Sequence, residues 1–132
     1  MATAQPEAAP RYRSGLEREL ADQLSAAGQA VHYETVKLRY EVPASMHTYT
    51  PDFVLSNGII IEAKGQFPLE DRRKMLLVRA QHPELDIRFV FWNARARLAR
   101  SSLTTNASWC EKHGFAYAHR KLPEEWLREA PS

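Results

Sequence analysis

The segment 52–64 (DFVLSNGIIIEAK) constrains the fold of this chain more than any other. Two runs rich in β-branched and aromatic residues flank Asn57-Gly58, and this pattern is typical of a β-hairpin. Side chains at positions i and i+2 of a strand lie on the same face, so Glu62 and Lys64 should point the same way. We therefore expect an antiparallel strand pair that presents an acid and a lysine on one face.

The register of this hairpin decides whether Asp52 joins that face. A two-residue turn would pair Asp52 with Ala63 and direct its side chain to the opposite face. A three-residue loop, with Gly58 in the left-handed conformation as a bulge, would instead pair Asp52 with Glu62. We predict the bulged loop, because only that register brings the two carboxylates together.

Helices and strands alternate in the rest of the chain, which predicts an α/β fold with a mixed β-sheet flanked by helices. Ser14 and Glu17 have capping-box spacing at the start of a helix that should end near Gly28. Alternating residues predict a strand over 31–42. The segment 43–50 begins with a proline that discourages a sharp reversal, and it is expected to be an extended polar connector. The later elements are predicted to be a helix over 69–81, a strand over 87–92, a helix around 108–112, a strand over 115–118 and a helix over 124–129.

Composition excludes several classes of protein. The chain has 132 residues, 44% of them hydrophobic and 26% charged, as in an ordinary single soluble domain. Its one cysteine, Cys110, cannot form an internal disulfide, which argues against a disulfide-stapled secreted protein and predicts a packing residue. No apolar run approaches the ~20 residues of a membrane span, so we expect a cytoplasmic protein. Residues 1–10 lack periodicity and are expected to be a disordered tail, which leaves 11–132 as one domain.

Basic residues are concentrated in the second half of the chain. Residues 1–65 carry 6 Lys/Arg and 8 Asp/Glu, whereas residues 66–132 carry 12 and 8. Arginines without nearby acids between residues 88 and 109 can contact phosphates, although a solvated charged face also explains such a run. The candidate phosphate-contacting residues are Arg72, Arg73, Lys74, Arg95, Arg97 and Arg100. The tryptophans are interpreted as core aromatics rather than as surfaces on which nucleobases stack; they are Trp92, Trp109 and Trp126.

Asp52 and Glu62, paired as predicted, would form an oxygen-rich site of the kind that Mg²⁺ or Mn²⁺ prefers. Such an ion lowers the pKa of a bound water and offsets negative charge on a phosphorus centre. Lys64 on the same face can orient that water and stabilise the same charge, so the set fits hydrolysis of a phosphodiester. The alternative is structural: Glu62 and Lys64 form a surface ion pair on an edge strand, and Asp52 only begins the preceding strand.

The string HTYTPDFVLSNGIIIEAKG (47–65) resembles the active-site segment of the PD-(D/E)xK nucleases. Within that superfamily the chain is most similar to the phage endonuclease I family, the Holliday junction resolvases of T-seven-like phages. The resemblance covers about residues 11–128 and continues in the blocks RSGLE (13–17), VPAS (42–45), QHPELDIRFVF (81–91) and CEKHG (110–114). Because the blocks follow the order of the family, chance is a poor explanation.

The resemblance implies roles for individual residues. Asp52 and Glu62 would be metal ligands, and Lys64 would be the catalytic lysine. Glu17 would be a further acid of the metal site, a role compatible with that of a capping-box glutamate. The backbone carbonyl of Ala63 would be an additional ligand, Mg²⁺ or Mn²⁺ would be the cofactor, and the basic residues named above would contact DNA.

The resemblance also implies a restriction-endonuclease-like core and a domain-swapped homodimer. The helix and strand of residues 11–42 would pack on the partner, residues 43–50 would be the bridge, and residues 51–132 would be the catalytic core. Each active site would be composite, with Glu17 from one protomer and the other site residues from its partner. Two sites related by a two-fold axis suit a four-way DNA junction.

The activity implied is that of a Mg²⁺-dependent endodeoxyribonuclease, encoded by or derived from a phage, that resolves four-way junctions and other branched DNA. Two alternatives stay open. One is a restriction-like endonuclease on duplex DNA, and the other is a catalytically silent DNA-binding protein on the same fold. The intact set of Asp52, Glu62 and Lys64 argues against a silent protein.

Overall fold

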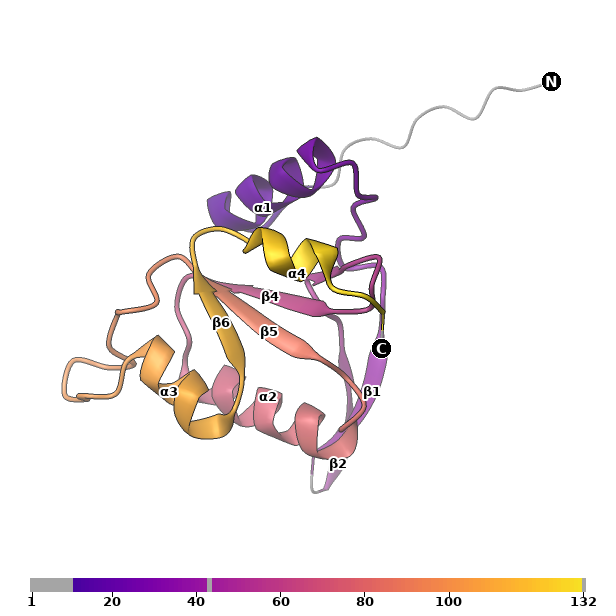
Figure 1. Cartoon of the computed structure of the whole chain (residues 1–132). Helices are drawn as coiled ribbons and strands as arrows, with labels where there is room; N and C mark the ends of the chain where they lie inside the picture. Colours follow the sequence, from indigo (N-terminus) through magenta and orange to yellow (C-terminus); the bar gives the residue numbers. More distant parts are fainter. Residues whose placement is uncertain (1–10, 43, 132) are drawn as a thin grey trace.

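The computed structural model of the chain describes residues 11–42 and 44–131, so the expected disordered tail at residues 1–10 lies outside the described residues. Within the described part, none of the helices has the length and apolar character that a membrane crossing requires. The helices and strands (Figure 1) follow one another in the order α1 (Gly15–Ala26), β1 (Leu38–Val42), β2 (Ser45–Tyr49), β3 (Phe53–Val54), β4 (Ile60–Lys64), α2 (Leu69–Gln81), β5 (Ile87–Phe91), α3 (Asn106–His113), β6 (Ala116–His119) and α4 (Glu124–Arg128).

The main sheet has the strand order β3-β4-β5-β6. β3 is antiparallel to β4, and β4, β5 and β6 are parallel to one another. Helices α1 and α4 cover one face of this sheet, and α2 and α3 cover the other (Figure 1). The predicted fold class, a mixed sheet flanked by helices, is therefore confirmed.

Alternation along β5 divides the core between the two faces of the sheet. Phe89 and Phe91 pack with Trp109 on the side of α2 and α3, whereas Val90 packs with Leu20 on the side of α1. Complete burial of a side chain of this size stabilises the fold by roughly 1.5–3 kcal/mol. Packing on both faces thus fixes the central strands and, with them, the strand ends at which the candidate site lies.

The hairpin β3–β4 has the predicted register. Phe53 pairs with Ile61, and the Leu55 N–H donates to the Ile59 carbonyl at 2.8 Å. Gly58 has φ +91°, which only glycine adopts without strain. The bulged three-residue loop is confirmed, and it places Asp52 opposite Glu62.

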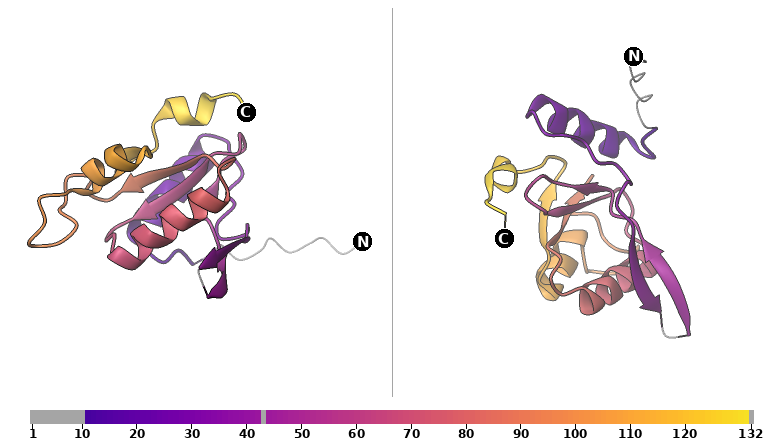
Figure 2. Two further views of the ribbon diagram at one scale, coloured as in Figure 1. Left: turned by 90° about the horizontal axis from the view of Figure 1, so that it is seen from below. Right: turned by 90° about the vertical axis from the view of Figure 1, so that its right-hand side faces the viewer.

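The first third of the chain differs from the prediction in two places. Regular strand structure begins only at Leu38, because Glu34 adopts φ +52° and interrupts the extended chain predicted over 31–42. Within this one chain the path reverses after Val42 instead of continuing as an extended connector, and the bridge between two chains expected over 43–50 stays a prediction. β2 folds back antiparallel to β1 with Val42 opposite Ser45, and Ala44 in this reversal has φ +102°. The resulting hairpin extends from the body of the molecule (Figure 2) and packs on it through contacts between β1 and α2.

The helices agree closely with their predicted bounds. α1 is capped by Ser14, whose hydroxyl accepts from the Glu17 N–H at 3.1 Å, and α2 spans the predicted residues. α3 includes the predicted residues 108–112 and ends at His113, with Gly114 at φ +75° as its C-cap. Pro123 is the N-cap of α4.

Candidate active site

The bulged hairpin brings Asp52 and Glu62 into direct contact. The Asp52 N–H donates to Glu62 Oε2 at 3.0 Å, and the Ala63 N–H donates to Asp52 Oδ2 at 2.9 Å. Glu62 is 3% exposed and lies at the centre of β4, beside the buried β5. Each carboxylate is therefore held by a backbone N–H of the facing strand, so the hairpin register itself orients both side chains.

Lys64 lies at the end of β4 on the same face as Glu62, as the alternation predicts. Its Nζ is 3.7 Å from Glu62 Oε1 and 3.4 Å from Asp71 Oδ2 on the first turn of α2. Two carboxylates from different elements thus hold the ammonium group near the edge of the sheet.

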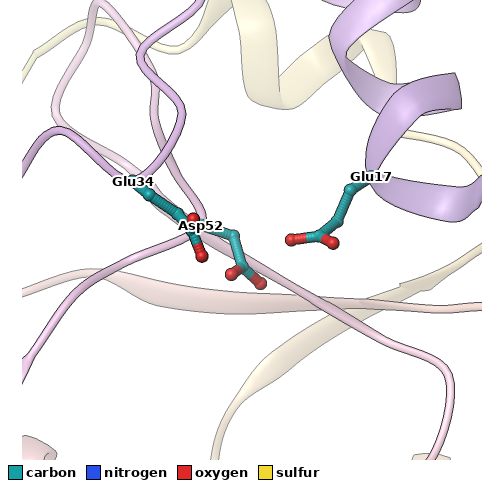
Figure 3. Close-up of side chains that lie close together, drawn as sticks. All are labelled: Glu17, Glu34 and Asp52. Atoms are coloured by element: carbon teal, nitrogen blue, oxygen red, sulfur yellow. The ribbon is translucent and has the colours of Figure 1, made fainter. Parts of the chain in front are cut away.

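Glu17 and Glu34 complete an acidic cluster with Asp52. Each of the three offers a carboxylate oxygen, and these oxygens lie within 4.8 Å of one another. Figure 3 shows Glu17 of α1 and Asp52 with their carboxylates directed toward a common space. The Tyr33 hydroxyl donates to Glu17 Oε2 at 2.9 Å, and Arg13 Nε lies 3.1 Å from Glu34 Oε1.

Burial and crowding shift the pKa values of these groups. Burial, with the Glu62 carboxylate as the second cause, raises the pKa of Asp52, and burial outweighs Lys64 in raising the pKa of Glu62. Burial by itself would lower the pKa of Lys64, but the Glu62 and Asp71 carboxylates outweigh it and the pKa of Lys64 is raised. The lysine is therefore a firmly charged ammonium, whereas the crowded acids need additional positive charge to ionise together.

The donor set of the cluster fits a hard divalent cation. Carboxylate oxygens are the ligands that Mg²⁺ and Mn²⁺ prefer, and Glu17, Glu34 and Asp52 supply them from three separate segments. Glu62 lies outside this group of mutual neighbours, because one of its oxygens binds the Asp52 N–H and the other faces Lys64. The arrangement can hold a metal ion next to a lysine, which suits metal-dependent hydrolysis of a phosphodiester.

The candidate phosphate-contacting residues divide into two groups. Arg72 binds the Phe67 carbonyl through Nε at 3.1 Å, and Lys74 lies over the ring of Tyr49 at 5.5 Å, so both have structural contacts. The other four are exposed and form no ion pair with any described residue; they are Arg73, Arg95, Arg97 and Arg100. Arg88, which belongs to the same arginine-rich stretch, is neutralised by Asp86 and Glu129.

Cys110 and two of the three tryptophans are packing residues, as predicted. Cys110 is fully buried, and burial raises the pKa of its thiol to about 12. Trp109 and Trp126 are 5% and 9% exposed. The interpretation of Trp92 as a core residue is wrong, because β5 ends at Phe91 and the Trp92 side chain is 41% exposed.

The structure adds residues to the site that the sequence patterns missed. Glu34 and Asp71 contact it from a loop and from α2, and neither is at a spacing that predicts such contact. Tyr33 binds Glu17, as described above. Tyr49 ends β2 with its hydroxyl buried and without a hydrogen-bond partner among the described residues, and burial together with the Glu62 carboxylate raises its pKa. A buried tyrosine hydroxyl beside a carboxylate would be visible only once the strands are paired.

Comparison with known proteins identifies the family of the chain. The chain matches the family of phage endonuclease I over residues 1–132. It is 50% identical over 118 residues to Endonuclease I of Escherichia phage T7, a match that covers 89% of this chain and 79% of that protein. It is 48% identical over 118 residues to Endodeoxyribonuclease 1 of Enterobacteria phage T3, covering 89% of this chain and 78% of that protein. The resemblance seen in the sequence is thus confirmed, and this chain belongs to the phage endonuclease I family.

Proposed function

We propose that this chain is a DNA endonuclease that hydrolyses phosphodiesters with Mg²⁺ and acts selectively on branched DNA, above all on four-way junctions. The names of its relatives, an endonuclease and an endodeoxyribonuclease, support a nuclease. The observation that carries the proposal is the meeting of Asp52, Glu62 and Lys64 at one edge of the sheet, with Glu17 of α1 beside them.

The metal ligands are those that the family resemblance implies: Asp52, Glu62 and Glu17 would hold the divalent ion, with the Ala63 carbonyl as a further ligand. Asp52 and Glu17 belong to the acidic cluster, and Glu62 would turn an oxygen away from Lys64 to reach the ion. Mg²⁺, when bound, supplies positive charge that makes water a better nucleophile and offsets charge on the phosphate. Lys64 stays protonated between two carboxylates, so its ammonium can stabilise the negative charge that develops on the scissile phosphate.

The proposal includes a PD-(D/E)xK core and a domain-swapped homodimer. The pairs that close β1 on β2 in one chain, from Leu38 with Tyr49 to Val42 with Ser45, would form equally well between two chains if residues 43–50 were extended as a bridge. Glu17 would then meet the partner's catalytic core, and each site would be composite. Two such sites can each nick one strand of a four-way junction.

The first experiment replaces Glu62 by Gln, which can still accept from the Asp52 N–H. We expect Glu62→Gln to bind a four-way junction as the wild type does and to cleave it several orders of magnitude more slowly in Mg²⁺. Glu124→Gln, on the exposed face of α4, is the matched control and should cleave normally. Unchanged cleavage by Glu62→Gln would refute the site.

The same assay separates the alternatives when a linear duplex of matched sequence is included. Equal cleavage of duplex and junction would indicate a restriction-like endonuclease. Binding of the junction without cleavage by the wild type, with and without Mg²⁺, would indicate a silent DNA-binding protein.

A second experiment tests the composite site. Glu17→Gln and Glu62→Gln are produced separately and together in one cell. In a swapped heterodimer, one site carries both changes and the other carries neither, so co-production should restore cleavage that neither variant has alone. In a dimer without the swap every site keeps one change, and the mixture stays inactive.

A further inference from the structure

Trp92 and Arg120 form a stacked pair on the surface of the protein. The guanidinium carbon of Arg120 lies 4.0 Å from the centroid of the Trp92 ring, which is a close cation–π contact. Although Arg120 lies over this ring, the Trp92 side chain is still 41% exposed. The remaining exposure therefore belongs to parts of the indole that no described residue covers.

The backbone of the pair adjoins the end of β4 that carries Lys64. The Trp92 N–H donates to the Lys64 carbonyl at 2.9 Å, and the Arg120 N–H donates to the Phe91 carbonyl at 2.8 Å. Because β4, β5 and β6 are parallel, their carboxyl ends meet at one edge of the sheet (Figure 1), with Lys64, Phe91 and His119 in one row. Trp92 and Arg120 are each the next residue beyond that row.

The surroundings of the pair favour an anionic aromatic ligand. A surface pocket of about 510 Å³ is lined by Trp92, Asn93, Arg95, His119 and Arg120, and none of these carries a negative charge. Neither arginine forms an ion pair within residues 11–42 and 44–131. Glu19 and Asp22 of α1 line an adjacent pocket that shares Arg120, so acids bound the patch on that side. Arg120 also has φ +64°, a conformation that a non-glycine residue adopts rarely and often at functional sites.

A partly exposed indole next to two guanidinium groups that form no ion pair with any described residue matches the chemistry of a nucleotide. The base can stack on the indole, and its phosphates can pair with the arginines. The location adds a constraint, because a nucleotide bound here lies at the same edge of the sheet as the end of β4 that carries Lys64.

We propose that Trp92 and Arg120 bind an unstacked nucleotide of the DNA at the edge of the sheet on which the candidate active site lies. The proposal rests on the function proposed above and deepens it by naming what the site recognises. A linear duplex keeps its bases in a continuous stack, whereas a branch point interrupts the continuous helix, so a base there is unstacked at lower cost. Stacking of one base changes affinity by about tenfold. The pair therefore contributes to selectivity for branched DNA.

The test uses the Glu62→Gln background, in which binding is measured without cleavage. The probes are a four-way junction with 2-aminopurine at positions flanking the crossover and a linear duplex of matched sequence. We expect Trp92→Ala to weaken junction binding about tenfold, to leave duplex binding within about twofold, and to abolish the change in 2-aminopurine fluorescence. Trp92→Phe, which keeps an aromatic face, should retain most of the affinity and the signal. Arg128→Ala, an exposed arginine of α4, is the control and should behave as the background does.

Every result of this binding experiment either supports or contradicts the proposed role of Trp92. Equal loss of junction and duplex binding in Trp92→Ala, or loss that Trp92→Phe does not rescue, would overturn the proposal. So would unchanged junction binding, or the absence of a fluorescence change at every labelled position. These results are independent of the proposed function, which stands or falls with cleavage by the wild type and its loss in Glu62→Gln.

Discussion

Gly58 allows a direct test of the turn that orients the acidic pair. A Cβ added at Gly58 would meet no heavy atom within 4 Å, so Gly58→Ala adds no steric clash. Its whole effect arises from φ +91°, a conformation that an L-residue adopts at a cost of roughly 1–2 kcal/mol. The loop cannot relax freely, because Asn57 Nδ2 donates to the carbonyls of Trp126 at 2.8 Å and Glu129 at 3.0 Å.

We therefore expect Gly58→Ala to lower the free energy of unfolding by about 1–2 kcal/mol and the midpoint of thermal unfolding by about 3–8 °C. Urea and thermal denaturation followed by circular dichroism measure both quantities. At a temperature where the variant stays folded, junction cleavage should remain within about twofold of the wild type, because the register and the Asp52–Glu62 contact persist.

Gly65→Ala is the matched control for stability. A Cβ there also meets nothing within 4 Å, and Gly65 does not require a positive φ. Its free energy of unfolding should change by less than about 0.5–1 kcal/mol. If Gly58→Ala were as stable as Gly65→Ala, the turn would not depend on the left-handed conformation and the reasoning that places Asp52 opposite Glu62 would be refuted.

Two further predictions follow from the buried titratable groups. The Cys110 thiol should resist alkylation at pH 8 in the folded protein and react only on unfolding, because burial raises its pKa to about 12; rapid labelling of the native protein by iodoacetamide would contradict this. The second prediction concerns Asp52→Asn, whose side-chain oxygen can still accept from the Ala63 N–H. This variant should have a higher midpoint of thermal unfolding than the wild type at pH 8 in EDTA. The reason is that burial raises the pKa of Asp52 and disfavours its charged form in the folded protein. Above pH 3.8, the ordinary pKa of an aspartate, the native state holds a proton that the unfolded chain has lost, so the stability of the wild type falls as pH rises. The stability advantage of Asp52→Asn should therefore shrink toward pH 4. A variant less stable than the wild type at both pH values would refute the raised pKa of Asp52.

Elements with a strong local signal could be predicted from the sequence. The β3–β4 hairpin followed from two β-rich runs around Asn57-Gly58, and its register from the requirement that Asp52 and Glu62 share a face. The helix predicted over 69–81 is α2. The strand over Ser45–Tyr49 could not be predicted, because four of its five residues are exposed and no apolar alternation marks a face. Its strand conformation depends on pairing with β1, which is a tertiary interaction that local patterns do not contain.

The candidate site was predictable to the extent that strand geometry determines it. Glu62 and Lys64 share a face because they are two residues apart, and the hairpin register adds Asp52. Glu17 required the family resemblance, because its position on α1 says nothing about which strand that helix covers. Asp71 had no sequence signal, since its contact with Lys64 depends on how the chain turns between β4 and α2.

The fold keeps several residues near the candidate site in unfavourable states. Glu34 has a positive φ, Glu62 is a buried carboxylate with a raised pKa, and the Tyr49 hydroxyl is buried without a partner among the described residues. Each of these states reduces stability, and none of them improves the packing of the sheet. All of them surround Asp52 at one place in the fold. Such a concentration of unfavourable states is expected where selection has favoured binding and catalysis over stability. A bound metal ion and a DNA phosphate would relieve the crowding of acids, which destabilises the unliganded protein.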